Sequence, residues 1–161
     1  MARRPKRGYI LAATVLLILV SVTGCAGSPP VSALQNQPDL AKETTLKEAA
    51  KDYFANIPSS YNLIDGPGLK AKMEHPERIY LVDIRKPEDF AVGHILGAVN
   101  IPFNEMGQRF DSLPKDKEII VYCYSGQTSG QAIAVLQMNG FNALSLLGGF
   151  PEWSKSFPVT K

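Results

Sequence analysis

The stretch 118–130 constrains the fold more than any other part of this sequence. It runs from a short apolar segment at 119–122 directly into the polar segment Cys-Tyr-Ser-Gly-Gln-Thr-Ser at 123–129. A short, β-rich apolar run of this kind is typical of a strand buried on both faces of a parallel sheet. Residues from about 129 to 138 are apolar enough to continue as a helix packed on that sheet. The stretch therefore predicts a buried strand, a tight polar loop and a helix.

Cys123 stands at the carboxyl end of this predicted strand, where open α/β sheets bind their ligands. The loop ends at a helix N-terminus, so backbone N–H groups and the positive end of the helix dipole would point towards the thiol. Such surroundings favour the thiolate, which is the nucleophilic form of cysteine. The alternative is a small, buried, apolar cysteine. We favour a reactive Cys123, because polar residues begin immediately after Tyr122.

The rest of the sequence alternates predicted strands with short helices. Strands are expected at 79–83, around 98–101 and at 142–147, with Ile64 starting a further short pairing segment. Helices are expected at 39–55, 69–74, 87–92 and 104–113, and a last one carries Trp153, which we expect to lie in the core rather than bind substrate. This alternation predicts an α/β class with a mainly parallel sheet.

The first 24 residues have the pattern of a secretory signal rather than of a folded domain. Four basic residues within 3–7 precede an uncharged, nearly all-apolar segment at 9–22. The sequence Val-Thr-Gly-Cys that ends at Cys25 resembles the lipobox of bacterial lipoproteins. The resemblance implies that residues 1–24 are a lipoprotein signal peptide and that Cys25 carries a lipid, which would anchor the protein to a bacterial membrane outside the cytoplasm.

Two alternatives remain for this segment. An uncleaved anchor would need an apolar stretch of about 20 residues, and 9–22 is shorter. Ordinary signal cleavage would leave Cys25 as a free thiol. All three possibilities predict export, and two of them tether the protein to the membrane.

The charge of the exported chain differs from that of the precursor. Residues 1–24 hold four of the 17 basic residues and no acidic one, so 13 basic and 15 acidic residues remain, a net charge of −2. The pI of about 8.5 therefore belongs to the precursor, and we expect no nucleic-acid partner. If Cys25 is acylated, Cys123 is an unpaired thiol in an exported protein, which indicates a reactive group or a protein thiol partner. No His and Cys residues have zinc-ligand spacing, so we expect no metal and no other cofactor.

Three segments are expected after the signal. Residues 25–38 contain Gly, Ser and Pro and predict a linker. Residues 39–60 form a helical extension, whose apolar positions, including Leu40, Leu46 and Phe54, predict an amphipathic helix packed against the domain. A helix that binds the membrane surface or a partner is the alternative. Residues 61–161 form the α/β domain.

Three motifs resemble those of rhodanese domains. Residues 81–102, with Asp-Ile-Arg and then Gly-His-Ile-Leu-Gly-Ala, resemble the entry signature of that family. Residues 123–129 are similar to its active-site loop, and Leu-Gly-Gly-Phe-Pro-Glu-Trp at 147–153 is similar to its closing motif. The resemblance covers roughly 62–156. It implies a rhodanese-like three-layer sandwich of about five parallel strands, and transfer of sulfane sulfur through a cysteine persulfide.

The resemblance also implies roles for individual residues. Cys123 would take sulfur from thiosulfate, a polysulfide or a persulfide and pass it to a thiol or cyanide. The residues that would hold the sulfur and the donor are Tyr124, Ser125, Gly126, Gln127, Thr128 and Ser129. From the residues themselves we expect Asp83 to support the site structurally, and His94 to be a hydrogen-bonded structural residue rather than a general base. Arg85 would either brace the site by pairing with Asp83 or point into the pocket and bind substrate.

Thr128 departs from the family pattern, in which this loop position is usually arginine. Arginine offers a forked and permanently charged set of donors for an oxyanion, whereas threonine offers one hydroxyl. Thiosulfate thus becomes a doubtful donor, and a low-turnover sulfur carrier or docking module becomes the alternative to an enzyme. The loop also lacks the extra residue and the arginine of related phosphatases, which argues against phosphatase chemistry.

Overall fold

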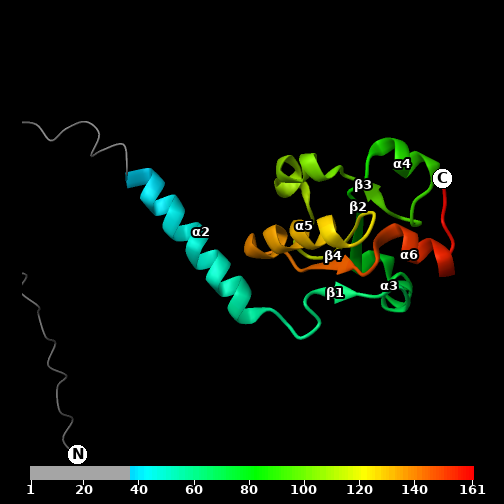
Figure 1. Ribbon diagram of the computed structural model, residues 1–161, viewed down its shortest axis with the longest axis horizontal. Coiled ribbons are helices and arrows are strands. Elements are labelled where there is room, and N and C mark those ends of the chain that lie inside the picture. The colour runs from blue at the N-terminus through cyan, green and yellow to red at the C-terminus, as the bar shows by residue number, and fades with distance from the viewer. Residues whose placement is uncertain (1–36) are drawn as a thin grey trace, which may run out of the picture. The chain divides into compact units, whose positions relative to one another are not determined.

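The computed structural model describes residues 37–161 (Figure 1). The predicted signal peptide, Cys25 and nearly all of the predicted linker lie outside the described residues. Across 37–161, no helix combines the length and the hydrophobicity that crossing a membrane requires.

Helix α2 spans Gln37–Asn56, close to the predicted 39–55. Its side chains Leu40, Leu46 and Phe54 are exposed, so the predicted packing of these residues against the domain is wrong. The physical reason is their spacing, because Glu43 and Lys47 fall between them around a helix of 3.6 residues per turn. These two charged residues therefore interrupt the apolar face at Leu40, Leu46 and Phe54, whereas Ala49, Ala50 and Tyr53 are half-buried.

The part of the chain that the structure describes contains one five-stranded sheet, and every strand pair in it is parallel. The strand order is β1-β5-β4-β2-β3. The strands are β1 (Leu63–Ile64), β2 (Ile79–Asp83), β3 (Val99–Asn100), β4 (Glu118–Tyr122) and β5 (Ala143–Leu146). The predicted α/β fold with about five parallel strands is confirmed.

Helices connect these strands. They are α3 (Gly66–Lys72), η1 (Pro76–Arg78), α4 (Pro87–Val92), η2 (Phe103–Ser112), α5 (Gln127–Met138) and α6 (Gly149–Ser156). The prediction for α4 is confirmed at both ends. Helix α5 begins two residues before the predicted start, because Gly126 takes a left-handed conformation with φ +92° and turns the chain into the helix at once.

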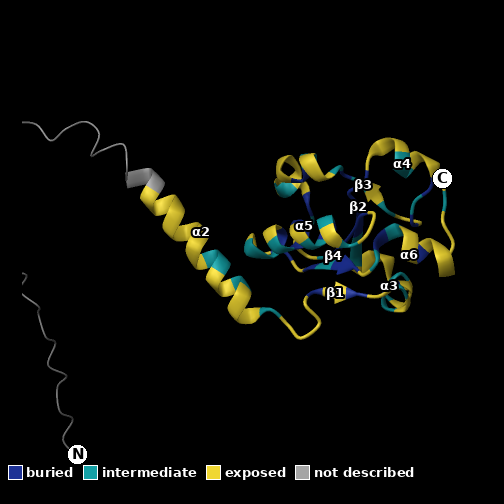
Figure 2. Cartoon of the chain, in the orientation of Figure 1, coloured by how far each residue is buried: buried dark blue, intermediate teal, exposed yellow. Residues whose placement is uncertain are grey.

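Side chains alternate between the two faces of β4, and each face lies in its own core cluster. Ile119 and Val121 pack in the cluster that includes Ile133 and Leu136 of α5. Ile120 and Tyr122 pack on the opposite side, in a cluster with Leu69 of α3 and Trp153 of α6. Figure 2 shows this burial at the centre of the sheet. The prediction of a strand buried on both faces is confirmed, and Trp153 lies in the core.

The N-terminus of α6 lies directly against the loop that follows β4. The Phe150 N–H donates a hydrogen bond of 2.8 Å to the Cys123 carbonyl. At Gly149, which has φ +64°, a Cβ atom would stand 2.4 Å from that carbonyl oxygen and 2.8 Å from the Ser125 nitrogen. Only glycine fits this close approach of two backbone segments.

Gly149→Ala is expected to lower the free energy of unfolding by about 2 kcal/mol or more, because it combines a left-handed backbone with a clash against main-chain atoms. Gly130→Ala is the matched control, since a Cβ there meets nothing within 4 Å inside α5. It is expected to stabilise the protein by about 0.5–1 kcal/mol. Urea unfolding measures both, and equal stability of the two variants would contradict the proposed packing.

Candidate functional site

Cys123 follows β4 directly, at the carboxyl edge of the sheet, and is only 2% exposed. Its Sγ accepts hydrogen bonds from the backbone N–H groups of Gly126, at 3.2 Å, and Ser129, at 3.4 Å. The Ser129 hydroxyl lies 3.5 Å from the same sulfur. The loop therefore wraps around the sulfur and directs donors at it, as expected for a site that holds an anionic sulfur atom.

The surroundings of Cys123 shift the pKa of its thiol in two opposing directions. Burial by itself raises the pKa, because it disfavours the charged thiolate. The Ser129 hydroxyl and the backbone N–H groups of Ser125, Ser129 and Gly126 lower it, and their combined effect is larger. The net result is a pKa below that of an ordinary cysteine, which favours the nucleophilic thiolate.

A pair of buried hydroxyl groups lies beneath the sulfur. The Ser129 and Ser145 oxygens are 2.7 Å apart, and both residues are fully buried. The Ser129 oxygen also lies 3.1 Å from the Gly126 carbonyl oxygen, and its single proton can be donated either to that carbonyl or to the sulfur. Ser145, which lies on β5, was not predicted from the sequence as a site residue. Its signal was a lone hydroxyl in an otherwise apolar strand, at the carboxyl edge where the site lies.

A cavity of about 510 Å³ opens above Cys123. Of the predicted loop residues, Tyr124 and Thr128 line it together with the cysteine. The other lining residues are Ile84, Lys86, Pro87, Pro102, Phe103, Asn104 and Glu105, none of which the sequence analysis placed at the site. Ser125 lines a different cavity, and Gln127 is exposed at the start of α5. Both can contribute backbone N–H groups to the loop.

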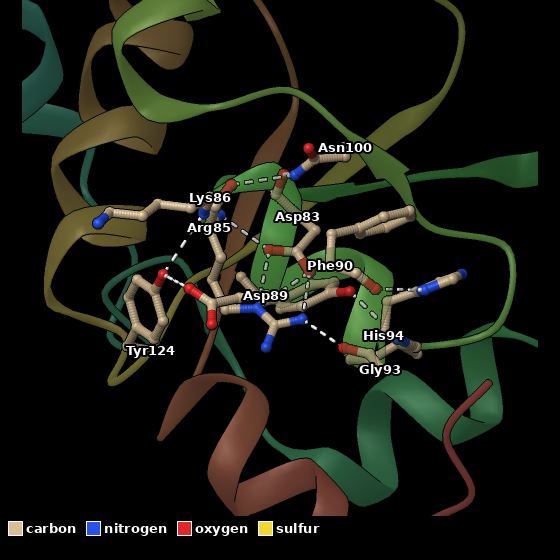
Figure 3. Close-up of polar contacts among 11 residues, drawn as sticks. Asp83, Arg85, Lys86, Asp89, Phe90, Gly93, His94, Asn100 and Tyr124 are labelled. Atoms are coloured by element: carbon tan, nitrogen blue, oxygen red, sulfur yellow. Dashed lines mark hydrogen bonds and ion pairs between the residues drawn. The ribbon is translucent and has the colours of Figure 1, made fainter. Parts of the chain in front are cut away.

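Tyr124 forms a wall of this cavity and is tied to α4. Its hydroxyl hydrogen-bonds to the Asp89 carboxylate and accepts a 3.4 Å hydrogen bond from the Lys86 backbone N–H (Figure 3). The bond to Asp89 raises the pKa of the Tyr124 hydroxyl, because ionisation would place two negative charges together. The tyrosine is therefore a neutral hydrogen-bond donor that links the loop to the start of α4.

Arg85 does not line the cavity, so of its two expected roles the geometry matches the ion pair with Asp83 rather than contact with substrate. It is 4% exposed, and its guanidinium holds the Asp83 carboxylate with a shortest distance of 2.6 Å (Figure 3). The same group donates to the Gly93 carbonyl at 2.7 Å. The reason is that Asp83 is fully buried at the end of β2, where an unpaired carboxylate would be costly. The side chain of Arg85 therefore braces the end of β2 through its ion pair with Asp83.

His94 also makes structural contacts rather than lining the cavity. Its Nδ1 lies 3.0 Å from the Phe90 carbonyl, and its ring stacks on Phe90 with 3.8 Å between centroids (Figure 3). Its backbone pairs with Thr160 near the end of the chain. Within 37–161, no group of three or more His, Cys, Asp or Glu side chains could hold a metal ion.

Comparisons with a family model, with curated proteins and with solved structures all find similarity to rhodanese-like or sulfur-transfer proteins. The family model described as a rhodanese-like domain matches residues 67–156. A protein named sulfurtransferase from Allochromatium vinosum is 37% identical over 95 residues, which cover 58% of this chain and 89% of that protein. The putative sulfur carrier protein YrkF from Bacillus subtilis is 30% identical over 97 residues, which cover 60% of this chain and 52% of that protein. A crystal structure of a rhodanese-related protein from Thermoplasma volcanium has a TM-score of 0.57 and 28% identity, and the match covers 62% of this chain and 98% of that one.

Ser129→Ala is expected to raise the pKa of Cys123. The variant removes a hydroxyl that lowers the pKa and keeps the burial that raises it. Alkylation by iodoacetamide, followed against pH, measures the midpoint of thiolate formation, and the midpoint should move to higher pH. Ser125→Ala is the matched control, because Ser125 acts through a backbone N–H that alanine retains. Equal midpoints for the wild type and Ser129→Ala would contradict the assignment.

Proposed function

Because the chain belongs to the rhodanese-like domain family, we propose that it is a sulfurtransferase that moves sulfane sulfur through a persulfide on Cys123. The observation that carries this proposal is the set of donors around one buried sulfur. The N–H groups of Gly126 and Ser129 converge on Cys123 Sγ at the base of a cavity. This arrangement suits a nucleophilic thiolate and an anionic persulfide equally.

The reaction consists of two displacements. In the first, the Cys123 thiolate attacks the outer sulfur of a donor, the bond between that sulfur and the rest of the donor breaks, and the remainder leaves as an anion. In the second, a thiolate or cyanide attacks the outer sulfur on Cys123 and releases the cysteine thiolate. The loop N–H groups stabilise negative charge on sulfur in both steps, which is the role of an oxyanion hole in acyl transfer.

Thr128 points to the kind of donor. It lines the cavity at the loop position where relatives usually carry arginine, and it brings no charge. Loss of a charge-assisted hydrogen bond costs about 1.5–3 kcal/mol, or about tenfold to a hundredfold in recognition of an oxyanion. A polysulfide or an organic persulfide, which needs less charge neutralisation, is therefore the better donor than thiosulfate.

A sulfur carrier with little turnover is the second candidate. Two observations favour it, namely the uncharged Thr128 and the likeness to a protein named as a putative sulfur carrier. Both candidates form a persulfide on Cys123, so the rate at which small donors load and acceptors unload the cysteine separates them.

Intact mass of the protein without residues 1–25 tests the proposal. Exposure to polysulfide is expected to add one sulfur atom to Cys123, and cyanide or a thiol should remove it over repeated cycles. Thiosulfate is expected to load the wild type slowly, and Thr128→Arg should raise that rate by about tenfold to a hundredfold.

Cys123→Ser is the control, since it keeps the loop and removes the nucleophile. Sulfur transfer that persists in this variant would contradict the assignment of Cys123. Loading without repeated turnover would favour the carrier. No gain in thiosulfate loading from Thr128→Arg would mean that the missing arginine is not what limits that donor.

We also propose that the domain is tethered outside the cytoplasm by lipid on Cys25. Support comes from the basic residues within 3–7, the apolar segment 9–22 and the Val-Thr-Gly-Cys sequence that ends at Cys25. Such a tether would place the cavity near a membrane surface and within reach of thiols of the cell envelope.

Cys25→Ala is expected to abolish incorporation of labelled palmitate and cleavage after Gly24, because lipidation needs the thiol. Mass measurement of the N-terminal peptide, together with membrane fractionation, checks both effects. A wild-type protein that keeps residues 1–24 in the membrane would instead indicate an uncleaved anchor. A wild-type protein cleaved without lipid would indicate ordinary secretion.

A further inference from the structure

The cavity above Cys123 is larger than a transferred sulfur atom requires. Its volume of about 510 Å³ lies in the range of sites that hold whole small molecules, about 300–1,000 Å³. Much of its wall is apolar and comes from Ile84, Pro87, Pro102 and Phe103. These residues come from the segments after β2 and β3, so they add a compartment that the sulfur-holding loop itself does not form. This compartment suits the organic part of a sulfur compound.

Two side chains of opposite charge line the cavity. Of the described residues that line the cavity, Lys86 is the cation and Glu105 is the anion. Lys86 precedes α4, whereas Glu105 lies in the first turn of η2, so the charges come from separate elements. The Lys86 ammonium is 4.0 Å from Glu88, and both of these side chains are largely exposed, so this ion pair is weak.

Glu105 is half-buried, and within 37–161 its carboxylate forms no ion pair. A small dianion such as thiosulfate would gain attraction from Lys86 but would also meet repulsion from this carboxylate. A molecule that carries both an ammonium and a carboxylate group could pair with each of them.

We propose that the cavity recognises a small zwitterionic thiol and its persulfide, with Lys86 binding the carboxylate and Glu105 binding the ammonium group. This inference rests on the proposed sulfur transfer at Cys123 and names its substrate class. Tyr124 and Phe103 flank the molecule, and its sulfur points to the loop. Thr128 then needs no positive charge, because the charged groups of the substrate lie away from the reacting sulfur.

The same molecule serves both directions of transfer. In loading, Cys123–S⁻ attacks the outer sulfur of R–S–SH, the S–S bond breaks, and Cys123–S–SH and R–S⁻ form. In unloading, R–S⁻ attacks the outer sulfur of Cys123–S–SH, and R–S–SH leaves with the regenerated Cys123–S⁻. Each step conserves atoms and electrons and needs no further oxidant or reductant. Recognition of R is therefore measurable with stable thiols as acceptors.

The test uses protein loaded with polysulfide and four thiols that differ in charge. Cysteine carries both charged groups, N-acetylcysteine only the carboxylate, cysteamine only the ammonium, and 2-mercaptoethanol neither. Rapid quenching and intact mass give the rate at which Cys123 loses its extra sulfur atom. Each rate is expressed as a ratio of variant to wild type, which cancels the intrinsic reactivity of the thiol.

Lys86→Gln is expected to lower this ratio about three- to fivefold more for N-acetylcysteine than for cysteamine, which is the upper range for an ion pair to an exposed lysine. Glu105→Gln is expected to lower the ratio more for cysteamine than for N-acetylcysteine. Both variants should lower the ratio more for cysteine than for 2-mercaptoethanol, and salt should reduce all of these differences.

Lys70→Gln and Glu74→Gln are matched controls, because they make the same charge changes at exposed residues outside the cavity. The inference is overturned if the Lys86 and Glu105 variants change all four ratios equally, or if the controls show the same order. Normal loading by polysulfide in that case would leave the proposed function standing. A wild type that takes no sulfur from polysulfide would overturn the proposed function and this inference with it.

Discussion

Burial of β4 on both faces fixes where every part of the candidate site lies. Residues 119–122 of this strand are each 0% exposed, and they alternate between two separate core clusters. A strand held in this way cannot slip by one residue without moving its apolar side chains to the wrong face. Cys123 therefore follows the sheet at one defined position, and packing of β4 in the core fixes where the loop around Cys123 lies.

Two further contacts hold the segments next to Cys123 in place. Close approach of Gly149 and Phe150 holds the backbone of Cys123 from the side of α6. The buried pair of Asp83 and Arg85 holds the neighbouring strand end and the Gly93 carbonyl. Removal of one partner from such a pair typically costs about 3–5 kcal/mol, so the segment that leads into α4 and the cavity wall depends on it.

In this site, the groups that contact the sulfur and the charged groups of the cavity lie on different segments. Uncharged N–H and hydroxyl groups of the loop hold the sulfur, whereas the charges of the cavity lie on Lys86 and Glu105 in other segments. Loop donors act on the thiolate from a fixed backbone and cannot be displaced by solvent as a mobile side chain can. Charges on the cavity wall can therefore change without altering the groups that contact Cys123.

Much of the fold followed from local sequence patterns. Apolar runs at 79–83 and 119–122, and the proline at the start of 87–92, predicted elements that the structure contains at those positions. The position of Cys123 between an apolar run and a helix start was enough to predict the strand end and its loop. These signals are reliable because hydrophobic period, strand length and helix starts depend on neighbours in the chain.

Tertiary structure decided what depends on residues far apart in sequence. From the sequence, Arg85 could have entered the pocket, and its bonds to the buried Asp83 and to the Gly93 carbonyl direct it away. Ser145 reaches Ser129 because β5 lies beside β4, and no local pattern marks that contact. Leu40, Leu46 and Phe54 of α2 stay exposed, because helical periodicity does not state whether a partner surface exists. The sequence by itself thus determined the elements and the position of Cys123 at a strand end, whereas packing of the sheet determined which side chains surround that cysteine.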